Sequence, residues 1–382
     1  DLFHSHTVEV RWRQEHHVGG AQATMLAGVQ GMYNDLHRRQ LGKGTDGADY
    51  DLSLTEPGWG RNLHLISRNV ALFAEEQIRL GARWRVSAGL RAELGQSERT
   101  GVVRYLPDTA MPGRVAHRIL LPGGGVSFQA RPNVKVYGGV SWAYRPVVFS
   151  DLIPPTALDR SNPDLQDAYG YNAELGVKGR HARVRYECTL FQLYYDNRIG
   201  VLTVTDVNGA QVQYKTNIGA SRTTGVECTM EAEAIKQGRF VLAAFVAASY
   251  MDGRYVRGAV GRQVSITGNR LENTPEWIAR GGLKVHWRGA ALNLLLSHVS
   301  KAYSDAVNTA APTANGAQGP IPAYTLVDVS AAVPLNAYLM LRLGVNNLTD
   351  ARYFTKRPSG YPGPGVWPSD GRTGFVSLQI RL

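Results

Sequence analysis

Hydrophobic and polar residues alternate with a period of two along most of the chain. Residues 82–94 show this most clearly, because apolar side chains at even positions alternate with arginine, serine, glycine and glutamate at odd positions. A period of two places the two sets on opposite faces of a β-strand. Three arginines and a glutamate are too much charge for an ordinary buried core. The pattern therefore predicts a sheet that meets lipid on one face and water on the other.

Short turns and long connections alternate between these segments. Short turns are expected near 17–20, 80–82, 131–133, 179–181, 236–238, 288–289 and 334–336. Longer connections are expected near 35–61, 98–113, 146–169, 205–212, 254–272, 303–322 and 348–370. About fifteen strands of roughly ten residues or more lie between them, which is the length that a tilted strand needs to cross a bilayer. We predict an all-β, antiparallel transmembrane β-barrel with short periplasmic turns and long extracellular loops.

The ends of the chain suggest that it is part of a longer protein. The first residues lack the charged and apolar regions of a signal peptide. If the C-terminus is periplasmic, the last strand (371–382) and the first (about 4–16) run in the same direction. Closed single-chain barrels normally have an even number of strands. We therefore expect a mature fragment or the tail of a longer chain, with two unpaired edges and no ability to insert alone.

Aromatic residues on the predicted strands fall at two heights, as interfacial anchoring requires. The short-turn end has Trp12, Trp84, Trp287 and Tyr338. The long-loop end has Tyr33, Trp142, Tyr144, Tyr171, Trp277 and Tyr324.

The formal net charge of +11 could reflect nucleic acid, anionic lipid or an anionic ligand. The basic residues are spread singly and no nucleic-acid-binding pattern accompanies them, so we expect no nucleic-acid partner. Catalytic and phosphate-binding motifs are missing, so we expect neither an enzyme nor a cofactor. Four histidines, His4, His6, His37 and His64, fall at the outer end of the first three strands. They could bind metal or haem, but solvated loop histidines are the favoured interpretation, and we predict no metal site.

Two cysteines, Cys188 and Cys228, fall on the lipid-facing positions of one predicted hairpin, within a residue or two of direct opposition. A disulfide could form between them in an oxidising compartment. Two small apolar side chains facing lipid are the favoured interpretation.

Arginines dominate the positions predicted to face the lumen, and strand direction places Arg145 and Arg280 near the outer mouth. Loop arginines that could join them are Arg160, Arg198, Arg254, Arg270 and Arg357. A basic vestibule would concentrate an anionic ligand, and guanidinium groups bind carboxylates well. The same arginines could instead pair with acidic groups of the protein or hold lipopolysaccharide at the rim. Both alternatives remain open.

Several short segments occur in a specific order along the chain. They are VALFAEEQ (70–77), GLRAE (89–93), LPG (121–123), YGG (137–139), YRP (144–146), NPDL (162–165), ELG (174–176), TNIG (216–219), TGVE (224–227), NTPE (273–276) and GVNNL (344–348) followed by Asp350 and Tyr353. This series resembles the TonB-dependent outer-membrane receptors, although Thr349 stands where that family usually has Phe. The tail at 353–372 is most similar to receptors of the ferric dicitrate type.

The resemblance implies a barrel of about 22 strands around an N-terminal plug. Residues 1–382 would be the C-terminal part of that barrel, about fifteen of its strands, with the plug and the first strands absent. The implied function is TonB-energised uptake across the outer membrane of a Gram-negative bacterium. The implied partners are a ferric chelate, the TonB complex acting through the plug, lipopolysaccharide and outer-membrane lipid. We expect a monomer.

The ligand can be narrowed further. No histidine lies between Pro146 and Asn162, where haem receptors of this family carry one, which counts against haem. The basic balance and the tail favour an anionic ferric chelate such as ferric citrate. The alternatives are a passive porin-like channel, a receptor for haem, cobalamin or an oligosaccharide, and an adhesion barrel. We expect Arg145→Glu to weaken ligand binding while leaving the barrel able to assemble.

Overall fold

One large antiparallel sheet makes up nearly all of the structure, a computed structural model. It describes residues 1–45, 51, 53–108, 111–156, 159–205, 211–260, 264–358 and 364–380. Within these, fifteen strands are eight residues or longer. They are β1 (Leu2–Val18), β2 (Ala21–Gly44), β3 (Leu54–Leu80), β4 (Trp84–Val103), β5 (Arg114–Arg131), β6 (Val134–Arg145), β8 (Ala168–His181), β9 (Val184–Thr205), β10 (Gln211–Gln237), β11 (Phe240–Val260), β13 (Trp277–Trp287), β14 (Ala290–Val299), β17 (Tyr324–Pro334), β18 (Leu339–Asn346) and β21 (Thr373–Ile380). The remaining elements are short: α1 (Phe149–Leu152), β7 (Asp159–Ser161), β12 (Val264–Ser265), β15 (Ala302–Tyr303), β16 (Pro320–Ile321), β19 (Phe354–Lys356) and β20 (Trp367–Pro368).

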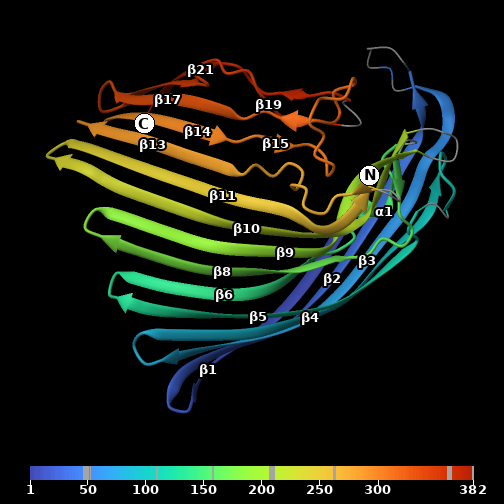
Figure 1. The fold of residues 1–382 in the computed structure, drawn as a ribbon, viewed down its shortest axis with the longest axis horizontal. Helices are drawn as coiled ribbons and strands as arrows, with labels where there is room; N and C mark the ends of the chain where they lie inside the picture. Colours follow the sequence, from blue (N-terminus) through green and yellow to red (C-terminus); the bar gives the residue numbers. More distant parts are fainter. Residues whose placement is uncertain are drawn as a thin grey trace.

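Each long strand pairs antiparallel with the next long strand along the chain. The sheet curves into a trough, with α1 on its concave side, the N-terminus at the long-loop end and the C-terminus at the short-turn end (Figure 1). Strands β1 and β21 form the two edges and do not pair with each other in the described part of the chain. The fold is therefore a partial β-barrel, which confirms the predicted fold class.

The register confirms that the two faces differ. Large apolar side chains on the outer, convex face are exposed, such as Val8 (70%) and Leu190 (58%). On the concave inner face, Glu9 accepts hydrogen bonds from Arg11 and Gln30. A broad band of exposed apolar side chains on one face of a sheet indicates a non-aqueous environment there. No helix among the described residues is long and apolar enough to cross a membrane.

Short turns occur close to where the sequence predicts them, although the turn expected at 179–181 lies at Ala182 and Arg183, after β8 ends at His181. The β1–β2 turn consists of Gly19 and Gly20, and the β13–β14 turn of Arg288 and Gly289. All four residues have positive φ angles, between 51° and 91°. Glycine adopts this conformation without steric penalty, which is why these positions are visible in the sequence.

The strand ends at the long-loop end differ from the prediction. A connection was expected at 35–61, but β2 continues to Gly44 and β3 begins at Leu54. The two strands pair along this extension, so backbone hydrogen bonds hold it although its hydropathy no longer alternates. The last strand begins at Thr373 rather than residue 371 and is described to Ile380, because Arg381 and Leu382 lie outside the described residues.

The two cysteines are directly paired across β9 and β10, and the structure joins them in a disulfide. The sequence favoured two unbonded cysteines, and this prediction is wrong: the disulfide links the two neighbouring strands covalently.

Candidate functional site at the mouth of the sheet

Connections at the long-loop end fold onto the inner face and bury a hydrophobic cluster there. We call this cluster the mouth core. It contains Leu63, Leu65, Val103, Leu106, Met111, Val115, Val147, Leu152, Ile153 and Leu165. Leu63 and Leu65 come from β3, whereas Leu152 comes from α1, so the core fixes the segment around α1 against the wall of the sheet. This end of the inner face is therefore partly covered by ordered chain.

A buried carboxylate, Asp151, lies at the centre of this covering. Its side chain is 2% exposed and forms ion pairs with Arg145 at 2.9 Å and Lys215 at 3.1 Å. It also accepts a hydrogen bond from the backbone N–H of Val148 at 3.1 Å. Burial alone would raise the pKa of the Asp151 carboxyl, but the hydrogen bonds from Arg145 and Val148 and the charge of Lys215 hold its pKa below the ordinary value. Asp151 is thus ionised and ties α1 to β6 and β10.

A second buried pair fixes the approach to the same segment. Asp167 accepts a hydrogen bond from the backbone N–H of Val147 at 2.8 Å and lies 2.7 Å from Nδ1 of His117. The other ring nitrogen of His117 lies 3.1 Å from the hydroxyl of Ser97. Farther from the mouth, Glu93 accepts hydrogen bonds from Tyr144 at 2.5 Å and from Asn69 at 2.7 Å. Sequence reasoning missed these contacts, because their partners lie on separate strands and nothing local marks them. It placed Tyr144 in the aromatic girdle, whereas the Tyr144 hydroxyl reaches the buried Glu93.

Four of the seven predicted ligand arginines are paired with carboxylates. Arg145 binds Asp151, as described above. Arg198 on β9 lies 3.2 Å from Glu272, and Arg254 on β11 lies 2.8 Å from Asp252. The Arg270 guanidinium pairs with Glu276, and the backbone of Arg270 forms an isolated antiparallel β-bridge with that of Arg254. These pairs support the alternative in which arginines hold the protein's own acidic groups.

Glu272, the acidic partner of Arg198, adjoins a second packed region over β9–β11. Its buried residues are Leu202, Ile218, Tyr255, Ile266, Leu271 and Ala306. The hydroxyl of Tyr255 donates to Glu272 at 2.6 Å, so Glu272 is held from two sides. Arg198 and Arg254 lie on strands rather than in loops. Arg198 is on β9, which runs to Thr205, where the connection was expected to begin, and β11 continues past its predicted end near 254 to Val260.

Two further arginines bind backbone carbonyls. Arg160 lies on β7, which pairs parallel with β10, and donates to the carbonyl of Asp159 at 2.8 Å. Arg357 follows β19 and donates to the carbonyls of Gly316 at 2.8 Å and Pro320 at 3.1 Å. The guanidinium of Arg357 also lies 4.8 Å from the ring centre of Phe354. Arg357 therefore fastens two connections to each other.

Arg280 differs from the other six. It lies on β13 at a position that alternates with the exposed Trp277, so its side chain belongs to the inner face. Within the described ranges it makes no hydrogen bond or ion pair, and it is exposed. Tyr324, expected in the outer aromatic girdle, shares this inner face, since it pairs with Val299 and Val299 pairs with Ile278. Tyr324 stacks on Tyr353 with 4.5 Å between the ring centres, and the charge of Arg280 lies close enough to Tyr324 to interact with it.

The wall below the mouth contains a hollow of about 470 Å³ on the inner face. Glycines of β5 and β6 form much of its surface, and Glu75, Arg91 and Glu174 also line it. The site as a whole offers ionic and hydrogen-bonding groups suited to binding rather than to covalent chemistry.

Histidines form a separate group on the outer face. His37 and His64 lie with Asp35 in the one group of three or more metal-binding side chains found among the described residues. They lie on strands, not in loops as expected, and they do not line the mouth.

Comparisons with known proteins agree with this architecture. A family model described as "TonB dependent receptor-like, beta-barrel" matches residues 2–348. The metal-pseudopaline receptor CntO of Pseudomonas aeruginosa is 24% identical over 325 residues, covering 82% of this chain and 40% of that protein. The probable TonB-dependent siderophore receptor PiuA of Acinetobacter baumannii is 20% identical over 340 residues, with the same coverage. The chain thus spans about 40% of the length of the curated relatives it matches.

Among solved structures, the unliganded ferric citrate transporter FecA matches with a TM-score of 0.79 and 18% identity. The match covers 99% of this chain and 54% of that one. The copper transporter OprC matches with a TM-score of 0.71 and 16% identity, covering 99% and 57%. At these identities the structural matches establish the fold.

Proposed function

The chain belongs to the TonB-dependent receptor family, as part of its β-barrel, and from this membership we propose that it serves in the uptake of a metal chelate across the outer membrane of a Gram-negative bacterium. In this proposal residues 1–382 form the C-terminal strands of the barrel, and energy is delivered by the TonB complex through a plug domain. The covered part of each relative is consistent with this, since the chain matches 40% of CntO and 54% of FecA.

The observation on which the proposal depends is the inward-folded mouth. Connections between the strands pack on the inner face around the mouth core and Asp151. A passive porin-like channel is expected to keep a water-filled lumen, whereas a receptor needs ordered loops to hold one ligand. An ordered covering therefore favours a receptor over a pore.

The printed names of the relatives favour a metal chelate as cargo. CntO is named for metal-pseudopaline, PiuA for a siderophore and FecA for ferric citrate. Within this class we propose an anionic ferric chelate such as ferric citrate. Arg280 is the arginine best placed to meet it, because the other six already bind carboxylates or carbonyls of the protein. We propose that those six arginines hold the loops in place. A ligand carboxylate could then bind one of them by replacing its partner within the protein.

The first experiment measures binding of ferric citrate to the full-length receptor in detergent, with wild type, Arg280→Glu and Arg85→Gln compared. Arg85 alternates with Trp84 at the short-turn end and so serves as an inner-face arginine far from the mouth. Loss of a charge-assisted hydrogen bond of about 1.5–3 kcal/mol predicts at least tenfold weaker binding for Arg280→Glu. Arg85→Gln should bind as wild type does.

Each other result changes a named part of the proposal. Unchanged affinity in Arg280→Glu removes Arg280 from the ligand contacts. Binding of haem, cobalamin, an oligosaccharide or a non-ferric metal chelate in place of ferric citrate changes the cargo. Uptake that persists in cells without TonB excludes the energised mechanism and favours the alternative of a passive porin-like channel.

A further inference from the structure

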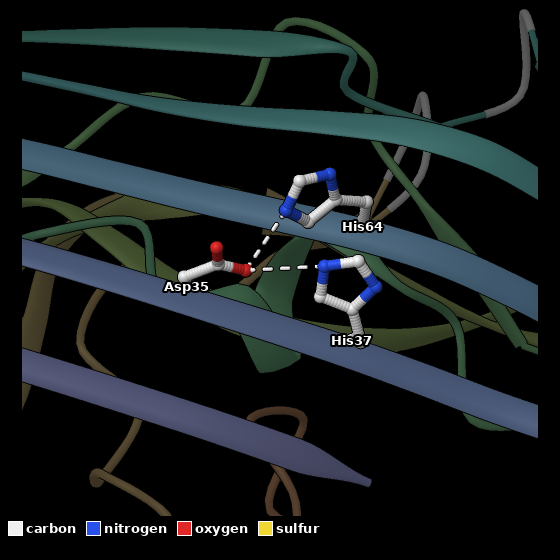
Figure 2. Close-up of side chains that lie close together, drawn as sticks. All are labelled: Asp35, His37 and His64. Carbon is white, nitrogen blue, oxygen red and sulfur yellow. Dashed lines mark hydrogen bonds and ion pairs between the residues drawn. The ribbon is translucent and has the colours of Figure 1, made fainter.

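Asp35, His37 and His64 converge on a small volume at the outer side of β2 and β3 (Figure 2). Nε2 of His64 lies 2.8 Å from Oδ1 of Asp35, and Nε2 of His37 lies 3.5 Å from the same oxygen. The two imidazole rings are 3.9 Å apart between their centres. His37 and His64 are directly paired across the two strands, so the register itself brings the rings together.

The cluster is on the opposite face from the mouth core. Leu63 and Leu65, on either side of His64 in the sequence, are buried in that core, and Leu36 of β2 is partly buried against it. Because side chains alternate along a strand, His64 and its partners face outward. They lie just beyond Tyr33 of the aromatic girdle at the long-loop end. Tyr33 is on the same face because it lies two residues before Asp35 on β2. The cluster is therefore separate from the proposed path of the ligand.

The three side chains are a donor set for a divalent transition metal. Zinc is bound by imidazole nitrogen and carboxylate oxygen at about 2.0–2.2 Å, in tetrahedral sites that often keep one position open. Tetrahedral geometry at those distances separates the ligand atoms by about 3.3 Å. The two N–O separations in the cluster bracket this value, so an ion can replace the present hydrogen bonds with little movement of the strands. The side chains are also only partly exposed, at 21% for Asp35, 34% for His37 and 35% for His64.

We propose that Asp35, His37 and His64 form a binding site for a divalent transition-metal ion, Zn²⁺ in the first instance, on the outer face of the barrel wall. His4 is directly paired with Asp35 across β1 and β2 and therefore shares this face, but it is not one of the three converging side chains. The ion links β2 to β3 at the base of their paired extension, which ends at Gly44 and Leu54. This site is independent of the proposed transport function.

Isothermal titration calorimetry with ZnSO₄ tests this assignment. The sample is the full-length receptor, purified without a histidine tag and stripped of metal with chelator. The double variant His37→Gln/His64→Gln removes two ligands and should lower the affinity for Zn²⁺ at least tenfold. His298→Gln is the matched control, because His298 is a single, partly exposed histidine on β14 that contacts the hydroxyl of Thr325 on β17. The control should bind Zn²⁺ as wild type does.

Thermal unfolding provides a second measurement that needs no disruptive variant. Zn²⁺ should raise the unfolding temperature of the wild-type protein, chelator should reverse the shift, and the milder substitution Asp35→Asn should reduce it. Equal Zn²⁺ affinity in wild type and the double variant overturns the site, as does an absence of Zn²⁺ binding by wild type. Ferric citrate binding by the same samples reports on the transport proposal separately.

Discussion

At the scale of single residues, Asp151 is the carboxylate on which the covered mouth depends. We predict that Asp151→Asn loosens the segment around α1, because Arg145 and Lys215 lose their shared counter-charge. The expected loss is about 1–3 kcal/mol of local stability, since both basic side chains retain access to water. Limited proteolysis within residues 146–165 should show faster cleavage in the variant. Asp164→Asn is the control, because Asp164 lies exposed in the same segment.

The lowered pKa of Asp151 also predicts how this protection depends on pH. A carboxyl whose folded pKa lies below its unfolded value contributes stability above the unfolded pKa, near 3.9, and the contribution is lost as pH falls through the folded value. Proteolytic protection of residues 146–165 should therefore be constant from neutral pH down to about 4 and should decline below it. Protection in Asp151→Asn should lack this decline. A wild-type profile identical to that of the variant would contradict the assigned role.

Residue-scale features differ in how far the sequence predicts them. The inner-face position of Arg280 follows from alternation with Trp277, which involves only neighbouring residues. The partners of Arg145 and Arg198 do not, because Asp151 and Glu272 reach them from other segments. The sequence therefore indicates which arginines face inward, but the charge that they leave available to a ligand depends on tertiary contacts. The same holds for Asp35, which meets His64 only through the β2–β3 register.

At the scale of elements, aromatic rings cover glycines across neighbouring strands. The directly paired residues are Gly28 and Phe73, Gly176 and Tyr137, Gly225 and Phe191, Gly282 and Phe245, and Gly344 and Phe375. In each pair a Cβ added to the glycine would lie within 2.6 Å of the ring. The glycine thus supplies the space into which the ring folds, and the ring shields a backbone without a side chain. These pairs help to fix register between strands.

We predict that Gly282→Ala destabilises the pairing of β11 and β13. The added Cβ would lie 2.3 Å from Cε1 of Phe245, so the ring must leave its position, and overpacking of this kind costs about 1–3 kcal/mol. Gly281→Ala is the matched control, because the nearest atom to its Cβ would be a carbonyl oxygen at 3.6 Å. Urea unfolding of the full-length receptor should show a lower midpoint for Gly282→Ala alone. Equal midpoints for the two variants would mean that Phe245 repacks freely.

Element boundaries were predicted well at one end of the sheet and poorly at the other. Gly19, Gly20 and Gly289 require backbone conformations that the sequence reveals, and the short turns were found there. At the long-loop end, β2 and β3 remain paired through residues expected to form a loop. Beyond the membrane both faces of a strand meet water or other loops, so hydropathy loses its period of two while the hydrogen-bond ladder continues. For this reason the hydropathy pattern does not predict the paired extension of β2 and β3 that positions His37 and His64.

At the scale of the whole molecule, the edges of the sheet set the condition for membrane insertion. Strands β1 and β21 each leave one side unpaired within the described chain. Every unpaired N–H or C=O group costs several kcal/mol in hydrocarbon, and open edges are therefore excluded from bilayers. A membrane-embedded form therefore needs these two edges to be paired, whether with further strands, with a second chain or with each other.

We therefore predict that residues 1–382, exported alone, do not form a membrane-embedded barrel. The test is semi-native gel electrophoresis of outer-membrane fractions. The unheated full-length receptor should migrate faster than the heated sample, as a folded barrel does, whereas the segment alone should migrate at the same position with and without heating. The open edges should also favour association, since an unpaired strand is a template for another. A folded, protease-resistant segment would contradict the prediction. Its mass in detergent would then distinguish two ways of satisfying the edges: a monomer would mean that β1 pairs with β21, and a dimer that two troughs pair edge to edge.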